Sequence, residues 1–143
     1  MLIKQISIFL ENKSGRLAEV TRILAANDID ISALSIADTT DFGILRLIVN
    51  KPEIAEKALK ENGFTVSCTS VIAVSVADKP GGLAAVLDIL DKDNISIEYM
   101  YAFVGKSEGE ALVILKLSDS DKAIQILSDN GINVVPSSSV YRF

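Results

Sequence analysis

Two short stretches of the sequence combine residue types that can hold both charged groups of a free amino acid. The first, residues 11–20, reads ENKSGRLAEV, and the second, residues 77–86, reads ADKPGGLAAV. In each, an alternating apolar run ends and a helical pattern begins, with glycine at the corner. The backbone N–H groups at a helix start bind carboxylates. The side-chain oxygen of Asn12 or Asp78 can accept hydrogen bonds from an ammonium group, so each corner predicts a zwitterion site.

The same residues also fit a purely structural role. A short polar residue at a helix start can accept hydrogen bonds from the helix's own N–H groups, and glycine allows the chain to turn. Duplication does not decide between the two interpretations, because it copies structural caps as readily as binding sites. At this point both remain open.

The two corners belong to an internal repeat that covers the chain. The early pairs are separated by 66 residues, as in Gly15 with Gly81, Leu17 with Leu83 and Ile31 with Ile97. The later pairs are separated by 68, as in Leu59 with Leu127 and Gly63 with Gly131. The two-residue insertion is assigned to the polar turn at 105–110, where insertions are tolerated.

Each repeat is predicted to form strand, helix, strand, strand, helix, strand. In the first repeat the strands are expected at 3–10, 29–37 and 42–49, with helices from Leu17 and over 52–62. Asn50 with Glu53, and Ser118 with Asp121, match capping boxes at the second helices, and Asn-Gly pairs suit their ends. The phase change between Ile31 and Leu34 predicts a bulge.

The segment at 64–77 closes the first repeat and opens the second without glycine or proline. It is predicted to be one long strand, or two strands with a tight bend, instead of a flexible linker. The order βαββαβ is the ferredoxin-like arrangement. The predicted fold class is therefore α+β, with two ferredoxin-like units over 1–70 and 71–143, each with an antiparallel sheet and helices on one face.

Composition excludes several classes of function. The chain has 143 residues, is 49% hydrophobic and carries a formal net charge of −5, which argues against nucleic acid because phosphate binding relies on clustered Lys and Arg. Tyr99, Tyr101 and Phe103 therefore do not point to RNA. No apolar stretch is long enough for a bilayer and no leader pattern precedes the first strand. We expect a soluble, cytoplasmic protein without membrane contact.

The sequence has one cysteine and no histidine. An intrachain disulfide, a thiolate metal cluster and every histidine-based catalytic arrangement are therefore excluded. Cys68 fits a small packed residue in an alternating strand. We expect no catalytic residue, metal or cofactor, and predict that the protein is not an enzyme.

The strings NKSGRLAEV and DKPGGLAAV, followed by NDIDI and DNISI, resemble the opening of the ACT domain. DKPGGL is close to that family's most recognisable motif, and the resemblance covers both repeats. It implies a tandem of ACT-like domains, 1–70 and 71–143, without an attached enzyme. ACT domains are regulatory modules of amino-acid metabolism that pair side by side and bind amino-acid effectors near the loop between the first strand and the first helix.

Carried over by position, the resemblance implies two sites. Their walls would be the corner residues Asn12, Ser14, Gly15, Arg16 and Leu17 with Asp78, Pro80, Gly81, Gly82 and Leu83, and the strand starts Ile31 and Ser32 with Ile97 and Glu98. The first repeat departs from the motif, with Asn in place of Asp and Ser in place of Pro.

The leading hypothesis is a regulatory protein that senses an amino acid and modulates a partner enzyme or transporter of amino-acid metabolism. The alternative is a dimerisation or scaffolding module for a partner enzyme that binds no metabolite. A homodimer is expected under both, because open sheet faces and edge strands need cover.

Overall fold

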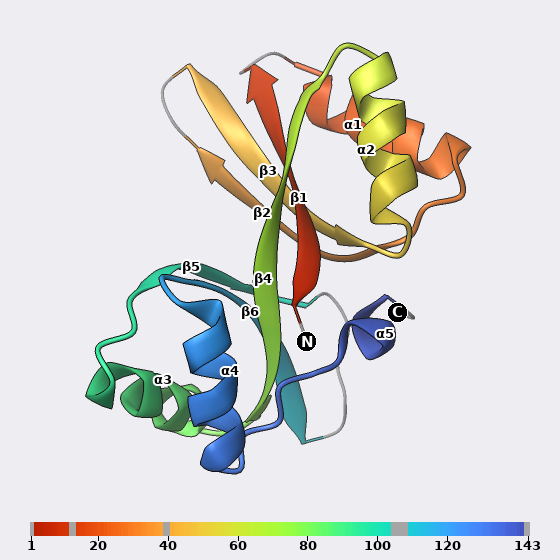
Figure 1. The fold of residues 1–143 in the computed structure, drawn as a ribbon. Helices are drawn as coiled ribbons and strands as arrows, with labels where there is room; N and C mark the ends of the chain where they lie inside the picture. The colour runs from red at the N-terminus through yellow and green to blue at the C-terminus, as the bar shows by residue number, and fades with distance from the viewer. Residues whose placement is uncertain (1, 12–13, 39–40, 104–108, 142–143) are drawn as a thin grey trace. The chain divides into compact units, whose positions relative to one another are not determined.

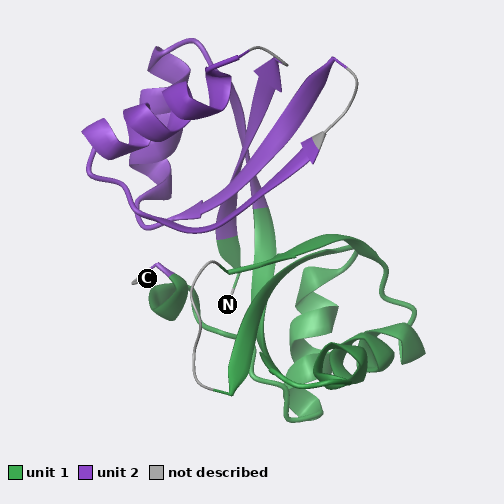
Figure 2. Ribbon diagram, turned by 180° about the vertical axis from the view of Figure 1, so that it is seen from behind, with its two compact units in different colours: residues 1–3, 70–140 green, residues 4–69, 141–143 purple. Residues whose placement is uncertain are grey.

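The computed structural model describes residues 2–11, 14–38, 41–103 and 109–141. The chain divides into two compact units (Figure 2). Unit 2 comprises residues 4–69 and 141–143 and holds the first repeat, whereas unit 1 comprises residues 1–3 and 70–140 and holds the second. The two termini are thus exchanged between the units. In unit 2, the hydroxyl of Tyr141 accepts a hydrogen bond of 2.8 Å from the backbone N–H of Lys4.

Unit 2 has the predicted βαββαβ order. Its elements are β1 (Ile3–Glu11), α1 (Arg16–Ala26), β2 (Ile31–Asp38), β3 (Phe42–Val49), α2 (Pro52–Glu61) and the first part of β4 (Thr65–Ala77). The strand order is β2-β3-β1-β4, and β3 is antiparallel to both β1 and β2. Both helices cover the same face of this sheet (Figure 1).

Unit 1 repeats the arrangement. The second part of β4 is followed by α3 (Gly82–Lys92), β5 (Ile97–Ala102), β6 (Glu110–Leu117), α4 (Ser120–Asp129) and the short α5 (Ser137–Val140). Strand β6 is antiparallel to β4 and β5. On the other side of β4, Val74 bridges Val134, and the N–H of Val135 donates to the carbonyl of Ala73 at 2.8 Å. The α+β prediction is confirmed in both units.

Strand β4 runs from Thr65 to Ala77 without interruption, so the first of the two predictions for this segment is confirmed. Its second part alternates as a half-covered strand should, with Ile72, Val74 and Val76 in the core of unit 1. The segment therefore has the hydrogen-bonding pattern of a strand and not of a loop.

Each unit has its own apolar core beneath its two helices. Helix α1 buries Val20 and Leu24, and α3 buries Val86 and Leu90 at the positions 66 residues later. The helical spacing of four residues places each pair on one face. Burying a leucine side chain contributes about 1.5–3 kcal/mol, so these stripes hold the helices on their sheets.

The predicted capping role of Asn50 is wrong. Helix α2 begins after Lys51, and Asn50 Oδ1 instead accepts a hydrogen bond of 2.9 Å from the N–H of Asp30, just before β2. The side-chain oxygen of Asn50 thus accepts from the backbone before β2 and not from the start of α2. A capping pattern in the sequence cannot reveal this alternative donor, because Asp30 and Asn50 lie 20 positions apart.

Ser118 behaves in the same way in the second repeat. Its Oγ accepts from the N–H of Ser96 at 3.1 Å, while Asp119 is the N-cap of α4 and accepts from the N–H of Lys122 at 3.1 Å. The predicted Ser118 cap is therefore displaced by one residue. The equivalent bonds in both repeats join the start of the second strand to the end of the third.

Other local predictions are confirmed. Gly63 and Gly131 stop α2 and α4 with φ of 87° and 76°, the left-handed region that favours glycine. The predicted bulge in β2 appears as a register shift between Ile31 and Ala33, and β5 has the equivalent shift.

Most of the turn at 105–110 lies outside the described residues. No helix in the described part of the chain is long and apolar enough to cross a membrane.

Candidate functional site

The corner between the first strand and the first helix has the same backbone in both repeats. Gly15 has φ 87° and ψ −7°, and Gly81 has φ 86° and ψ −9°. Each glycine is the N-cap of its helix, and its carbonyl accepts the first helical hydrogen bond, from Glu19 at 2.9 Å and from Ala85 at 3.0 Å. A left-handed N-cap is easily adopted only by glycine, which explains the glycine at both positions.

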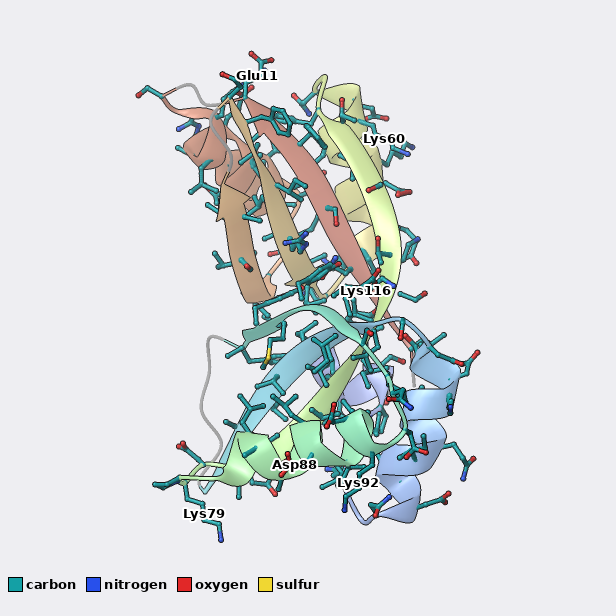
Figure 3. The ribbon with its side chains drawn as sticks, turned by 90° about the vertical axis from the view of Figure 1, so that its left-hand side faces the viewer. Glu11, Lys60, Lys79, Asp88, Lys92 and Lys116 are labelled. Carbon is teal, nitrogen blue, oxygen red and sulfur yellow. The ribbon has the colours of Figure 1, made fainter. Side chains whose placement is uncertain are left out.

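The N-cap glycines have no side chain with which to cap their helices. In unit 1, the nearby Asp78 is exposed, and its backbone N–H donates to the carbonyl of Gly109 at 3.1 Å. Among the described residues, the Asp78 carboxylate makes no hydrogen bond or ion pair. Lys79, at the same corner, points away from the ribbon (Figure 3). Asn12, the equivalent of Asp78, lies outside the described residues.

Gly82 has a steric role that the sequence does not reveal. A Cβ added to it would lie 1.9 Å from the carbonyl oxygen of Ala77, at the end of β4. That carbonyl also accepts a hydrogen bond of 2.9 Å from Lys79, and the N–H of Gly82 donates to the carbonyl of Lys79 at 3.0 Å. The start of α3 is therefore pressed against β4. The first repeat has Arg16 at this position, so the two corners differ in this respect.

Arg16 is already partnered within unit 2. Its Nη1 lies 3.1 Å from Glu19 Oε2, its Nη2 lies 3.4 Å from Glu11 Oε1, and its Cζ lies 5.0 Å from the ring centroid of Phe64. The hydrogen bond to Glu19, assisted by Glu11, raises the pKa of Arg16. The guanidinium charge is thus balanced by carboxylates of its own unit. Arg16 is in consequence a weak candidate for binding an effector carboxylate.

The strand residues predicted as the opposite wall lie at the other end of each sheet. In unit 2, Ile31 pairs with Val49 and Glu11 pairs with Phe42, which are seven residues apart on β3, or roughly 23 Å. In unit 1, Ile97 pairs with Leu117 and Ala77 with Glu110, again seven residues apart on β6.

Within one unit, Ile31, Ser32, Ile97 and Glu98 therefore do not lie beside the corner, and their role as the opposite wall of a site stays a prediction. The first helix carries the chain back along the sheet, so the second strand starts at the end where the first strand began. Ser32 is also only 4% exposed, and Glu98 Oε2 lies 3.0 Å from Lys116 Nζ.

The remaining corner residues are accessible. Ser14 and Pro80 are exposed, and Leu17 and Leu83 retain 40% and 36% of their accessible surface on the first turns of α1 and α3. A large exposed apolar side chain beside a helix start can contact the side chain of a ligand held there. The structure therefore keeps Ser14, Gly15 and Leu17 together, and Asp78, Pro80, Gly81 and Leu83 together.

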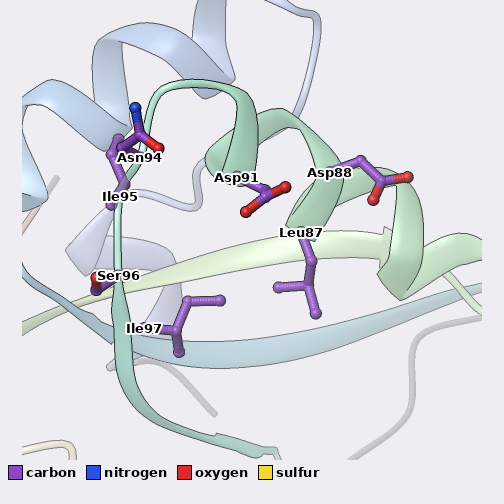
Figure 4. Close-up of a pocket in the computed structure, with 7 residues that line it drawn as sticks. All are labelled: Leu87, Asp88, Asp91, Asn94, Ile95, Ser96 and Ile97. Carbon is purple, nitrogen blue, oxygen red and sulfur yellow. The ribbon is translucent and has the colours of Figure 1, made fainter.

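Ile97 lines a hollow at the opposite end of α3 (Figure 4). Its volume is about 620 Å³, and it lies between the second half of α3 and the start of β5, with Asp88 and Asp91 projecting from the helix. Unit 2 has the equivalent hollow, about 430 Å³, where Lys51 Nζ donates to the carbonyl of Asp28 at 3.0 Å.

The described residues contain no group of three or more His, Cys, Asp or Glu able to hold a metal ion.

Cys68 is held as a thiol by its surroundings in unit 2. Its Sγ donates a hydrogen bond of 2.6 Å to Glu56 Oε2. Burial, followed by this hydrogen bond, raises the pKa of Cys68 to about 11 from 9.0. The same hydrogen bond lowers the pKa of Glu56. The arrangement suppresses the thiolate and therefore the nucleophilicity of the sulfur.

Alkylation of Cys68 by iodoacetamide at pH 8 should be about a hundredfold slower in the folded protein than in urea, because a shift of two pKa units reduces the thiolate fraction by that factor. Glu56→Gln should speed alkylation, and Glu61→Gln on the same helix is the control. Because the thiol pKa is raised on folding, the free energy of unfolding should fall as pH rises from 9.0 to about 11. Equal alkylation rates in folded and unfolded protein would contradict this assignment.

Comparison with known proteins gives matches over the whole chain. Protein BT0572 from Bacteroides thetaiotaomicron is 46% identical, with 100% of this chain and 98% of that chain covered and a TM-score of 0.95. The ligand-free regulatory subunit of aspartate kinase from Thermus thermophilus is 18% identical, with 90% and 93% covered and a TM-score of 0.66. The corresponding subunit from Thermus flavus is 17% identical, with 88% and 90% covered and a TM-score of 0.62.

The two kinase subunits show a shared fold. No protein of curated function matches the chain. The family model described as an ACT domain pair matches residues 1–142, nearly the full length. The chain therefore belongs to the family of ACT domain pairs.

Proposed function

We propose that this protein senses a free amino acid and modulates a partner enzyme or transporter of amino-acid metabolism. It acts in the cytoplasm as a homodimer and catalyses no reaction itself. Membership of the ACT domain pair family supports a regulatory role, since ACT domains are regulatory modules. The fold that it shares with regulatory subunits of aspartate kinase supports a partner enzyme.

The observation that carries the proposal is the corner of unit 1. Asp78 is exposed beside the start of α3, the N-cap there is glycine, and Leu83 stands on the first turn. An effector carboxylate would accept hydrogen bonds from N–H groups of the first turn, where the helix dipole favours negative charge. Its ammonium group would donate to the Asp78 carboxylate, and its side chain would contact Leu83.

Regulation then requires that the effector bind one arrangement of the protein better than another, since only differential affinity shifts an equilibrium. The edge strand β2 offers a place for a second copy. Leu34 and Ile36 on this strand are 43% and 46% exposed, and an uncovered apolar edge favours pairing. Effector binding would stabilise one packing of the two copies.

Asp78→Asn should weaken binding of the effector about tenfold or more, because the amide removes the charge that holds the ammonium group. The melting temperature should stay nearly unchanged, because Asp78 is exposed. Asp93→Asn, an exposed carboxylate at the other end of α3, is the matched control. If both variants bind as tightly as the parent, Asp78 is not part of the site.

Calorimetry against the twenty amino acids tests the function itself. The protein is first unfolded and refolded to remove any effector acquired during expression. Saturable heat with one or a few amino acids is expected. A flat trace with all twenty, from protein with a native circular dichroism spectrum, would refute the sensor proposal.

One observation favours the alternative, a dimerisation or scaffolding module that binds no metabolite. The guanidinium of Arg16 is shared between Glu11 and Glu19, so the first corner is satisfied by its own unit. This function predicts flat calorimetry together with a stable dimer in sedimentation. A sensor predicts heat from at least the unit 1 corner.

A further inference from the structure

Helices α2 and α4 both end at an Asn-Gly pair, the dipeptide in which asparagine most readily loses its side-chain amide. The pairs are Asn62-Gly63 and Asn130-Gly131, at equivalent positions of the two repeats. Glycine has no side chain to shield its backbone nitrogen, so this nitrogen can approach the side chain of the asparagine before it. The two pairs therefore offer the same reaction in two different surroundings.

Deamidation of either pair needs only water as a reactant. The backbone nitrogen of Gly131, after losing its proton to solvent, attacks Cγ of Asn130 and forms a new N–C bond. The Cγ–Nδ2 bond breaks, and the side-chain nitrogen takes a proton from water and leaves as ammonia. Water then opens the resulting five-membered succinimide at one of its two carbonyl carbons, which gives aspartate or isoaspartate. Nothing is oxidised or reduced.

The native end of α4 keeps the two reacting groups of this pair apart. Asn130 has ψ 13°, whereas closure of the five-membered ring needs ψ of about −120°, outside both the helical and the extended regions. The N–H of Gly131 donates to the carbonyl of Ser128 at 3.1 Å. Asn130 Nδ2 donates to the carbonyl of Ile126 at 2.8 Å. The reaction therefore requires that the end of α4 open first.

The end of α2 protects Asn62 in the same way. Asn62 also has ψ 13°, and its Nδ2 donates to the carbonyl of Ala58 at 2.7 Å. The N–H of Gly63 donates to the carbonyl of Lys60 at 3.1 Å. The local geometry therefore gives no reason for one asparagine to react before the other.

The chain that follows α2 is firmly attached to unit 2. Phe64, directly after Gly63, is only 7% exposed and belongs to the core cluster of this unit. Strand β4 begins at Thr65, is 13 residues long and lies next to β1 in the sheet. Figure 1 shows the end of α2 passing directly into this strand. Opening of the end of α2 would therefore disturb a core aromatic ring and a long strand.

The chain that follows α4 is attached by fewer contacts. Ile132, directly after Gly131, is half-buried. The chain then meets β4 over residues 133–135, where Val134 forms an isolated bridge with Val74, flanked by two backbone hydrogen bonds of 3.0 Å and 2.8 Å. It continues from there to the short α5 (Figure 1). Because local opening is easiest where few buried contacts must break, the end of α4 should open more often than the end of α2.

We propose that Asn130 is a site of spontaneous deamidation that reacts through opening of the end of α4, and that it reacts faster than Asn62. The product does not restore the helix end. Aspartate lacks the donor to the Ile126 carbonyl and adds a negative charge where the helix dipole is also negative, and isoaspartate lengthens the backbone by one carbon before Gly131. This modification site goes beyond the proposed function and does not require that the protein bind an amino acid.

Peptide mapping by mass spectrometry of the full chain tests the site. The protein is incubated at mildly alkaline pH in native buffer and, in parallel, in guanidinium chloride, and fragment ions then separate Asn130 from Asn133. In native buffer Asn130 is expected to deamidate at least about fivefold faster than Asn62, and both at least about tenfold more slowly than in denaturant. In denaturant the two rates are expected to agree within about twofold, because both asparagines precede glycine.

Val134→Ala provides a matched variant, because it weakens the attachment after α4 and leaves Asn130 and Gly131 unchanged. Val134 is only 2% exposed, so its truncation should speed deamidation of Asn130 about tenfold and leave Asn62 at its original rate. The rate at Asn62 in the same molecule shows whether unit 2 is still folded. Phe64→Leu is the reciprocal variant, which should speed deamidation of Asn62 and not of Asn130, and it keeps the test available where Val134→Ala fails to fold.

Three results would overturn the proposal. The first is an equal rate at Asn62 and Asn130 in native buffer, and the second is a rate at Asn130 that Val134→Ala leaves unchanged. The third is a rate at Asn130 that is as fast in native buffer as in denaturant, since the helix end would then give no protection.

Discussion

Gly82→Ala is expected to lower the free energy of unfolding by about 3 kcal/mol, and the melting temperature by roughly 10 °C, because it overpacks a rigid backbone contact. The added Cβ would lie 1.9 Å from the carbonyl oxygen of Ala77 and 2.9 Å from its carbonyl carbon. Neither atom belongs to a flexible side chain, so α3 must move away from β4. Thermal unfolding followed by circular dichroism measures the effect.

The duplicated chain supplies matched controls for this substitution. Arg16→Ala alters the equivalent position in unit 2, where a Cβ is already accommodated, and should change the melting temperature by only a few degrees. Gly81→Ala places a Cβ where no atom lies within 4 Å but where φ is 86°, so only backbone strain of about 1–2 kcal/mol is expected. A Gly82→Ala variant as stable as Arg16→Ala would contradict the close approach.

Leu90→Ala and Leu24→Ala are each expected to lower the free energy of unfolding by about 2–5 kcal/mol, because each removes a buried side chain and leaves a cavity. The two leucines occupy the same position in the two repeats and are 0% and 1% exposed. They belong to separate core clusters, one in each unit. Urea unfolding should show a lower midpoint for both.

Leu83→Ala and Leu17→Ala serve as controls on the same helices. These leucines are 36% and 40% exposed, so their truncation should lower the free energy of unfolding by much less than the core substitutions do. If Leu90→Ala is no more destabilising than Leu83→Ala, the assignment of α3's buried face is incorrect.

Local sequence patterns predicted the elements and the corners well. The helical pattern from Leu17 marked α1, and the glycines at positions 15 and 81 marked the turns at the corners, where the structure has both in the left-handed region. These features depend on residues within one turn or one strand, so a short segment of the sequence is enough to predict them. The strand β4 was predictable for the same reason, since it has no glycine or proline.

The site was harder to predict because its residues are distant in the sequence, and the order and direction of the strands decide which of them lie together. Ile31 and Ile97 were grouped with the corners by position in the motif, although the first and second strands run parallel in each repeat. Following the chain direction through the helix would have placed them at the far end of the sheet. Phe9 and Phe42 are distant in sequence, and the pairing of β1 with β3 brings their rings together.

The exchanged termini impose an order on assembly during translation. Residues 4–69 leave the ribosome first, but their unit also includes Tyr141, whose hydroxyl accepts from the N–H of Lys4 at 2.8 Å. That contact becomes available only after synthesis has reached Tyr141, near the end of the second repeat. A chain released prematurely within α4 would therefore lack a native contact in the repeat that was made first.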